Sequence, residues 1–277
     1  MAQKSILITG CSSGIGYDAA ITLKARGWRV FAACRSESDC ARLRDEGLES
    51  PLIDYSDTAS ISNGLDEVLT ATGGTLDALF NNGAYGMPGA VEDLPTDSLR
   101  EIFEVNFFGY HELTRRVIPV MRKQGQGRIV QCSSTLGLVV MRWRGAYNST
   151  KFALEGHTDT LRLEMRDTDI HVSLIEPGPI TTNFRKNSIA PFEKWINWKA
   201  SVRVDQYEAN VVKRLYTPSI GPDPFELPPS AVTKKLIHAL EAQRPKPRYY
   251  VTGITYIMGA LRRILPTRVL DWVIARY

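Results

Sequence analysis

The sequence predicts a single-domain α/β protein built on a parallel sheet that helices cover on both faces. Short apolar runs alternate with longer segments of helical periodicity, which is typical of successive β–α–β units. Runs such as Ile6–Ile8 and Leu79-Phe80 are continuously apolar, as expected of strands buried on both faces. Because no repeat, low-complexity tract or linker divides residues 1–277, we expect one domain.

Seven strands are expected in order along the chain. They are Ser5–Thr9, Arg29–Ala33, Pro51–Asp54, Asp77–Asn81, Arg128–Cys132, Val172–Glu176 and Tyr249–Thr252. Helical periodicity is clearest over Gly16–Arg26, Asp97–Arg122 and Tyr147–Arg166. Gly27 suits the C′ position of the first helix, because glycine adopts a left-handed backbone without steric cost.

Two segments depart from this pattern. Residues 181–229 are rich in proline and aromatics, and so long an irregular stretch is typically functional, here a substrate lid. Residues 254–277 predict one or two amphipathic helices, broken at Pro266. Their apolar face with basic flanks suits a pocket cover or a subunit contact, with a membrane surface as the alternative.

The composition is that of an ordinary globular protein, with 43% hydrophobic residues, 23% charged residues and a net charge of +4. Basic residues are scattered among almost as many acids, which argues against nucleic-acid binding. The start of the chain runs directly into a strand and leaves no room for a signal peptide. No apolar stretch reaches the roughly 18 to 20 residues that cross a bilayer. We therefore expect a soluble cytoplasmic protein, with peripheral membrane contact as the alternative.

Cysteines and histidines suggest no metal or disulfide chemistry. The cysteines form no CxxC pair and fit buried free thiols: Cys11, Cys34, Cys40 and Cys132. The histidines show no metal-ligand spacing: His111, His157, His171 and His238. No catalytic metal is expected.

A glycine-rich loop, Thr9–Gly16, follows the first strand and opens a helix. Phosphate binding needs backbone N–H groups at a helix N-terminus, with glycine wherever a side chain would block close approach. Gly10 suits the tight turn, Gly14 the approach to a pyrophosphate, and Gly16 the packing of helix on strand. The loop predicts a dinucleotide site, the alternative being an ordinary glycine turn.

Arg35 follows the second strand, where NAD sites carry an acid for the ribose hydroxyls. Its guanidinium fork suits a 2′-phosphate, to which Ser12 adds a hydroxyl, so we expect NADP(H) rather than NAD(H). The alternative is a surface cation at a strand end.

Tyr147 and Lys151 stand four residues apart, which places them on one face of a helix. A tyrosine has a pKa near ~10, and a nearby cation is expected to lower it toward acid/base use. Ser134, at the end of a strand, is expected to hold the substrate oxygen. Asn106 is a polar residue among apolar ones on a long helix, for which a satisfied amide at a helix bend is the alternative.

Together these residues resemble the short-chain dehydrogenase/reductase family from about Ser5 to Tyr250. The family pattern appears here as Thr9–Gly16, Asp54, Asn81-Asn82-Gly83-Ala84, Asn106, Ser134, Tyr147 with Lys151, and Pro177-Gly178. The resemblance implies a Rossmann-type doubly wound sheet with a seventh strand. It also implies a homo-oligomer, a dimer or tetramer, formed through the helices Asp97–Arg122 and Tyr147–Arg166.

The resemblance also implies roles. Tyr147 is the acid/base, Lys151 binds the nicotinamide ribose and tunes Tyr147, Ser134 orients the carbonyl, and Asn106 supports a relay water. Asp54 meets the adenine, and Asn82 with Gly83 lines the adenosine ribose. The remaining cofactor-binding residues lie in the glycine loop and after the sixth expected strand: Ser12, Ser13, Ile15, Pro177, Gly178, Ile180 and Thr182.

One departure concerns the turn Asn81–Ala84, whose last two residues are exchanged relative to the commonest family form; it puts the backbone at Ala84 in question. Within the family, the loop Gly10–Gly16 and the segment Tyr147–Gly156 resemble the 17β-hydroxysteroid and retinol dehydrogenase branch.

Aromatic residues near the site predict an apolar substrate. Those expected to reach it are Met141, Trp143, Phe184, Phe192, Trp195 and Trp198; packing of the lid onto the domain is the alternative for each. Arg142 and Arg144 flank Trp143 and are interpreted as solvated surface charges, with attraction of an anionic substrate as the alternative. The expected function is NADP-linked interconversion of a hydrophobic alcohol and its ketone or aldehyde, such as a steroid, retinoid or fatty aldehyde. Two alternatives remain open: a 3-ketoacyl reductase and a dinucleotide-sensing protein without turnover.

Overall fold

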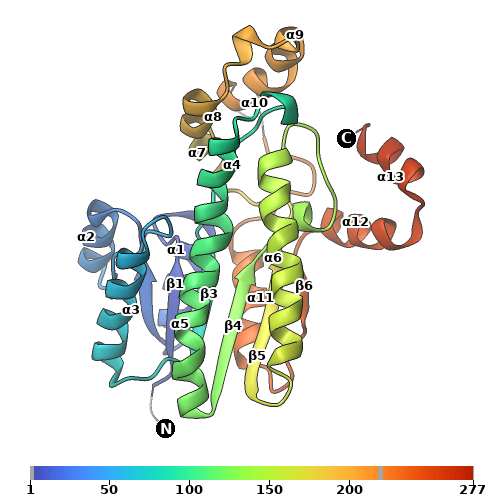
Figure 1. Cartoon of the computed structure of the whole chain (residues 1–277). Coiled ribbons are helices and arrows are strands. Elements are labelled where there is room, and N and C mark those ends of the chain that lie inside the picture. Colours follow the sequence, from blue (N-terminus) through green and yellow to red (C-terminus); the bar gives the residue numbers. More distant parts are fainter. Residues whose placement is uncertain (1–2, 218–220, 277) are drawn as a thin grey trace.

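The apolar runs form six parallel strands within the described residues, 3–217 and 221–276, of the computed structural model (Figure 1). The strands are β1 (Ser5–Thr9), β2 (Arg29–Ala33), β3 (Ala78–Asn81), β4 (Gln126–Cys132), β5 (Asp169–Glu176) and β6 (Arg248–Tyr250). Their order in the sheet is β2-β1-β3-β4-β5-β6. The winding therefore reverses between β1 and β3, as in a Rossmann-type sheet.

The expected strand Pro51–Asp54 is wrong as a separate element. The segment makes one isolated bridge, between Leu52 and Cys34, and Glu49 just before it bridges Phe31. Pro51 has no N–H to donate, so a regular ladder beside β2 is not sustained. The described sheet thus has six strands where seven were expected.

The helices fill the intervals between strands. They are α1 (Gly14–Ala25), α2 (Glu37–Asp45), α3 (Thr58–Thr72), α4 (Thr96–Phe103), α5 (Gly109–Gln124), α6 (Gly145–Glu164), α7 (Phe184–Asn187), α8 (Ile189–Trp195), α9 (Val204–Gln206), α10 (Lys213–Tyr216), α11 (Ser230–Glu241), α12 (Gly253–Ile264) and α13 (Thr267–Ile274). Gly27 has a φ of +89° just beyond α1, as predicted. The expected helix Asp97–Arg122 is instead α4, a π-helical turn at Glu104–Phe108, and α5.

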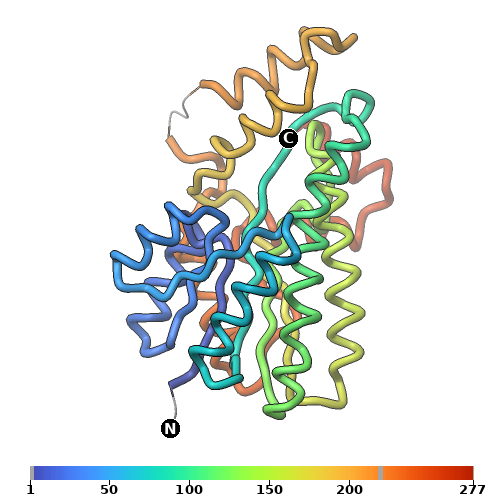
Figure 2. Tube along the Cα trace, turned by 60° about the vertical axis from the view of Figure 1, so that its left-hand side comes forward, coloured from blue at the N-terminus to red at the C-terminus, as the bar shows by residue number. Residues whose placement is uncertain are grey.

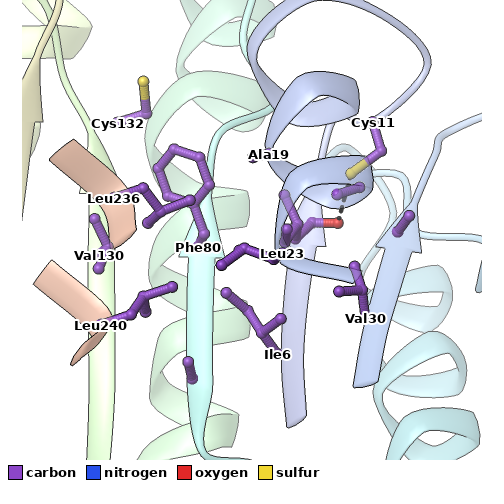
Figure 3. Close-up of a cluster of buried hydrophobic side chains, with 14 of the residues drawn as sticks. Ile6, Cys11, Ala19, Leu23, Val30, Phe80, Val130, Cys132, Leu236 and Leu240 are labelled. Atoms are coloured by element: carbon purple, nitrogen blue, oxygen red, sulfur yellow. Dashed lines mark hydrogen bonds between the residues drawn. The ribbon is translucent and has the colours of Figure 1, made fainter. Parts of the chain in front are cut away.

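Alternate residues of each strand supply two separate cores. Ile6 and Ile8 face α1, α2 and α11, whereas Leu7 faces α3, α5 and α6. Figure 3 shows the first core, in which Phe80 lies among Leu23, Leu236 and aliphatic side chains of the neighbouring strands. All four cysteines are buried and free, which confirms that expectation.

The carboxyl ends of the strands converge at one edge of the sheet, and a buried polar network ties them together. The Thr9 and Tyr55 hydroxyls are 2.6 Å apart, and Tyr55 donates to Asn81 Oδ1 over 2.5 Å. Asn81 Nδ2 in turn donates to Thr114 and Gln131, each over 2.9 Å. The loops that follow β1 and β3 are therefore held at a fixed separation.

Residues 181–217 stand beyond this edge as a group of short helices (Figures 1 and 2). The tail forms α12 and α13, with Pro266 at the N-cap of α13, as predicted. Tyr277 lies outside the described residues. Among the helices that the structure describes, none is both long enough and apolar enough to span a membrane.

The exchanged glycine and alanine leave the turn after β3 unstrained. Gly83 and Ala84 both lack a positive φ, and a Cβ added to Gly83 would meet its nearest neighbours at 3.4 Å. Gly10 differs, because its φ is +67° and a Cβ there would lie 2.6 Å from Gly83 Cα.

We predict that Gly83→Ala changes the free energy of unfolding by no more than about 1 kcal/mol, because alanine fits this backbone and restricts the unfolded chain. Gly10→Ala should lower it by about 2 kcal/mol or more, because a left-handed backbone and a close contact oppose alanine. Urea unfolding without dinucleotide measures both. Equal losses in the two variants would contradict this geometry.

Candidate active site

Tyr147 and Lys151 lie one turn apart on α6, and their side chains are only 8% and 1% exposed. The Lys151 ammonium donates a 2.7 Å hydrogen bond to the Cys132 carbonyl oxygen at the end of β4. It lies 5.6 Å from the centroid of the Tyr147 ring and 5.3 Å from that of Tyr110. The i, i+4 spacing thus brings phenol and ammonium into one buried site.

Burial shifts the pKa of both groups toward their neutral forms. It raises the pKa of Tyr147 above its usual value, while the nearby Ser134 hydroxyl and the charge of Arg144 act in the opposite direction. It lowers the pKa of Lys151 to about 8. Lys151 was expected to lower the pKa of Tyr147, but the pKa is raised because desolvation outweighs every opposing contribution. The cation that contributes most to lowering the Tyr147 pKa is Arg144. Tyr147 is therefore a neutral phenol at neutral pH, the form that donates a proton.

Ser134 follows β4 and caps the short 3-10 turn Thr135–Gly137. Its Oγ accepts a 3.1 Å hydrogen bond from the Leu136 N–H, and its hydroxyl lies close enough to Tyr147 to lower the pKa of that phenol. The Thr135 N–H donates to the Pro177 carbonyl oxygen over 2.8 Å, which ties this turn to the end of β5. The structure therefore brings Ser134 and Tyr147 together, as the sequence predicted.

Asn106 is fully buried in the π-helical turn between α4 and α5. Its side chain pairs with the backbone of Tyr85, accepting from the N–H over 3.1 Å and donating to the carbonyl over 2.9 Å. Nδ2 also lies 3.3 Å from Thr150 Oγ1. The amide is thus satisfied by protein groups, as the alternative interpretation of a helix bend predicted.

The glycine loop has the shape that phosphate binding requires. Gly14 has a φ of +60°, and a Cβ there would lie 2.9 Å from Thr182 Cγ2. A Cβ on Gly16 would lie 2.4 Å from the Gly10 carbonyl oxygen, so only glycine lets α1 pack this closely. Ser13 caps α1 without a side-chain hydrogen bond, and the first turn holds no acid. The free N–H groups at this helix end suit an anion.

Asn82 holds the loop in place. Its Nδ2 donates to the Thr9 carbonyl oxygen over 3.1 Å and lies 3.4 Å from that of Gly10. Gly83 packs against Gly10 in the same contact. Ile15 turns away from the loop and packs against the first core.

Arg35 and Asp54 are the residues expected at the adenosine end of a dinucleotide. Arg35 is exposed just beyond β2, and its guanidinium has no hydrogen bond or ion pair within residues 3–217 and 221–276. Arg42 donates to the Ser12 carbonyl oxygen over 2.7 Å, a contact that the sequence did not reveal because a backbone acceptor has no residue signature. Asp54 Oδ1 accepts from the N–H and the hydroxyl of Ser56, at 2.9 and 2.7 Å.

The segment after β5 contains the residues expected at the nicotinamide end of a dinucleotide. A Cβ on Gly178 would lie 2.1 Å from Thr252 Oγ1, so this turn requires glycine. Ile180 pairs with Leu227 in an isolated bridge and packs on the first core. Thr182 lies over Gly14, which places the two expected cofactor-binding loops against each other.

The residues expected to contact substrate lie in three places. Phe184 packs edge-on against the Tyr147 ring, with centroids 5.3 Å apart, and Trp195 joins the same cluster. Met141 and Trp143 instead line a separate cavity beside the start of α6. Phe192 is fully buried against Tyr207 and Ile196, which is the lid packing that the sequence offered as the alternative. Trp198 packs against Tyr207, 6.5 Å between centroids.

Comparison with known proteins decides the family. The sequence model described as short chain dehydrogenase matches residues 4–191. The chain is 41% identical over 272 residues to the uncharacterized oxidoreductase YbbO of Escherichia coli (strain K12), covering 98% of this chain and 94% of that protein. The chain belongs to the short-chain dehydrogenase/reductase family.

Further similarities agree with this assignment. Human retinol dehydrogenase 8 is 29% identical over 272 residues, covering 92% of this chain and 83% of that protein, so the expected retinol dehydrogenase-like relatives are confirmed. A short chain dehydrogenase/reductase from Burkholderia phymatum, solved in complex with NAD, has the same fold with a TM-score of 0.77 at 24% identity, covering 99% of this chain and 96% of that one.

As a short-chain dehydrogenase/reductase, the protein is an oxidoreductase that acts on CH–OH and C=O groups with NAD(P). The glycine cradle and free N–H groups of its loop fit such a dinucleotide. Within residues 3–217 and 221–276, no group of three or more His, Cys, Asp or Glu side chains is placed to hold a metal ion.

We predict that carbonyl reduction slows as the pH rises through about 8, because Lys151 is charged below that pKa and neutral above it. Tyr147 stays protonated across this range, since burial raises its pKa. The pH profile of kcat/KM for the reduced dinucleotide reports the groups of the free enzyme.

Lys151→Arg is the matched variant, because a guanidinium does not lose its proton in this range. It should be slower overall but lack the decline near pH 8. A wild-type profile that is flat to pH 10, or the same decline in the variant, would contradict the assignment.

Proposed function

We propose that the protein interconverts a hydrophobic alcohol and its ketone or aldehyde with NADP(H), with Tyr147 as the acid/base. The observation that carries the proposal is the buried, neutral Tyr147 phenol beside the Ser134 hydroxyl, with the Lys151 ammonium 5.6 Å from its ring. A proton donor, an orienting hydroxyl and a cation together suit transfer of a proton to a carbonyl oxygen.

In the direction of reduction, the substrate oxygen accepts hydrogen bonds from the Ser134 and Tyr147 hydroxyls. NADPH, when bound, supplies the hydride that the carbonyl carbon needs. Tyr147 passes its proton to the oxygen as negative charge develops there, and the Lys151 ammonium stabilises the resulting phenolate. Burial excludes competing water, since Tyr147 is only 8% exposed.

The cofactor preference rests on Arg35. An exposed guanidinium without a partner in the described residues stands where an NAD site carries an acid. A 2′-phosphate would give it the bidentate partner that it lacks. The loop residues Gly10 to Gly16, with Asp54, Asn82 and Pro177 to Thr182, would hold the remainder of the dinucleotide.

The apolar substrate is supported by the cluster around Tyr147, which includes Tyr85, Met87, Leu136 and Phe184. Residues 181–229 would act as the lid, since Phe184 reaches the Tyr147 ring from this segment. The tail would serve as a pocket cover, because Ile254 and Met258 pack against Val139 in the loop after Ser134.

We further propose that the protein forms a homo-oligomer through the outer faces of α5 and α6. Phe108, Phe152 and Leu163 on and beside these helices are exposed apolar side chains, at 46%, 38% and 59%. Apolar groups gathered on two adjacent helices suit contact with a second copy.

We predict that Tyr147→Phe lowers kcat by about 100-fold or more, because it removes the proton donor, and leaves NADPH affinity within about threefold. Steady-state kinetics and calorimetric NADPH binding measure the two effects. Tyr256→Phe, at an exposed site on α12, is the control and should match the wild type. Substantial activity in Tyr147→Phe would refute the role.

We predict that Arg35→Ser lowers kcat/KM for NADPH by about 10- to 100-fold and leaves the value for NADH nearly unchanged, because only the 2′-phosphate loses a charged hydrogen-bond partner. Arg100→Ser, an exposed cation on α4, is the control. A higher kcat/KM of the wild type for NADH than for NADPH would contradict the proposed cofactor preference.

A further inference from the structure

The cavity lined by Met141 and Trp143, of about 630 Å³, opens beside the N-terminus of α6 and is strongly basic. Its walls come from the turn before α6, the short helices of residues 185–215 and the end of the tail. The cations that line it are Arg142, Arg144, Arg185, Lys213, Arg214 and Arg276. Asp223 is the only acidic residue among its described lining residues.

This single carboxylate is already engaged. Asp223 pairs with Arg185 over 2.8 Å and with Arg214 over 2.7 Å. The Arg144 guanidinium, in contrast, makes no hydrogen bond or ion pair with any residue that the structure describes. Arg144 was interpreted from the sequence as a solvated surface charge; it is instead partly buried in the cavity wall.

Arg144 is in an electrostatically unfavourable place without an anion. Burial lowers its pKa to about 10, and the neighbouring Arg214 and Arg185 add to this effect. It also occupies the N-cap of α6, where the helix dipole is positive, and the first turn of α6 holds neither an acid nor a side-chain cap. Each of these costs would be offset by a bound negative charge.

The backbone beside Arg144 is strained at Trp143, which also lines the cavity. Trp143 has a φ of +65°, a left-handed conformation that is rare for a bulky residue. Strain of this kind persists where the surroundings fix it, often at ligand sites. Here the turn sets both Arg142 and Arg144 in the cavity lining, while the Trp143 ring packs on Tyr207 with 4.9 Å between centroids.

The cavity lies close to the proposed chemistry. Arg144 is three residues before Tyr147 on α6, and its charge lowers the Tyr147 pKa. Tyr147 does not itself line the cavity, but a group bound by Arg144 would lie about one helical turn from it, within reach of a chain of several carbons.

We propose that this cavity binds an acidic headgroup, a carboxylate or sulfonate, on the same substrate whose carbonyl Tyr147 protonates. The inference rests on the proposed function and narrows its substrate class to an amphiphile: an apolar carbonyl compound with one anionic end. Arg144 and Arg214 bind the anion, and Met141 with Trp143 contacts the adjoining apolar part.

Turnover of matched substrates tests the proposal. We would compare ω-oxo carboxylates of four to ten carbons with their methyl esters and with simple aldehydes of equal length, using NADPH. For at least one length, kcat/KM should be about tenfold or more higher for the acid than for the ester. Arg144→Gln and Arg214→Gln should each remove most of this preference. Arg166→Gln, an exposed cation beyond the opposite end of α6, should retain it.

Binding supplies a readout that does not depend on turnover. Decanoate and decanesulfonate should quench the tryptophan fluorescence of the full-length protein without dinucleotide, and decanol should bind about tenfold more weakly or not at all. Arg144→Gln should weaken both anions and leave decanol unchanged.

The outcomes separate the two proposals. If no carbonyl compound is reduced but the anions bind through Arg144, the proposed function fails and the anion site stands. If aldehydes and esters have the same kcat/KM as the acids at every length, the anion site is overturned. It is also overturned if decanol binds as tightly as decanoate.

Discussion

The site depends on a buried charge. The Lys151 ammonium is 1% exposed, and a charge so far from water is tolerated only where polar groups replace its hydration. The Cys132 carbonyl oxygen at 2.7 Å and the face of the Tyr110 ring provide that replacement. The contact fastens α6 to the end of β4. Because Ser134 stands two residues beyond Cys132, and Tyr147 one turn before Lys151, the same contact sets the two hydroxyls side by side.

Two other parts of the molecule flank this site: the glycine loop after β1 and the N-terminus of α6. On one side, Gly10, Gly14 and Gly16 allow backbone contacts that any Cβ would block, and a network from Thr9 to Gln131 keeps the loops apart by a fixed distance. On the other side, α6 begins with an uncapped N-terminus and Arg144, which leaves positive charge uncompensated beside Tyr147. Dinucleotide and substrate would thus meet at α6 from opposite directions, one held by backbone N–H groups and the other by side-chain cations.

Local patterns predicted the features that depend on local geometry. The βα alternation predicted the parallel sheet, a one-turn spacing placed Tyr147 near Lys151, and Pro266 marked the break in the tail. Local patterns did not predict contacts between residues distant in sequence or contacts made by backbone groups. The Cys132 carbonyl carries no sequence signal, and the satisfied amide of Asn106 depends on Tyr85, 21 positions away. The lost strand at Pro51 reflects a missing N–H beside β2, and Arg144 looked like a surface charge because its neighbours Arg185 and Arg214 are distant in sequence.

The most direct test of the central claim is NADPH consumption by the purified protein across steroid ketones, retinal, medium-chain aldehydes and acyl thioesters. We expect turnover with at least one apolar ketone or aldehyde and little or none with the thioesters, because Phe184 and the lid enclose the space beside Tyr147. Turnover restricted to 3-ketoacyl thioesters would replace the proposed substrate class. NADPH binding without consumption of any of these compounds would contradict the assignment of Tyr147 as a working proton donor.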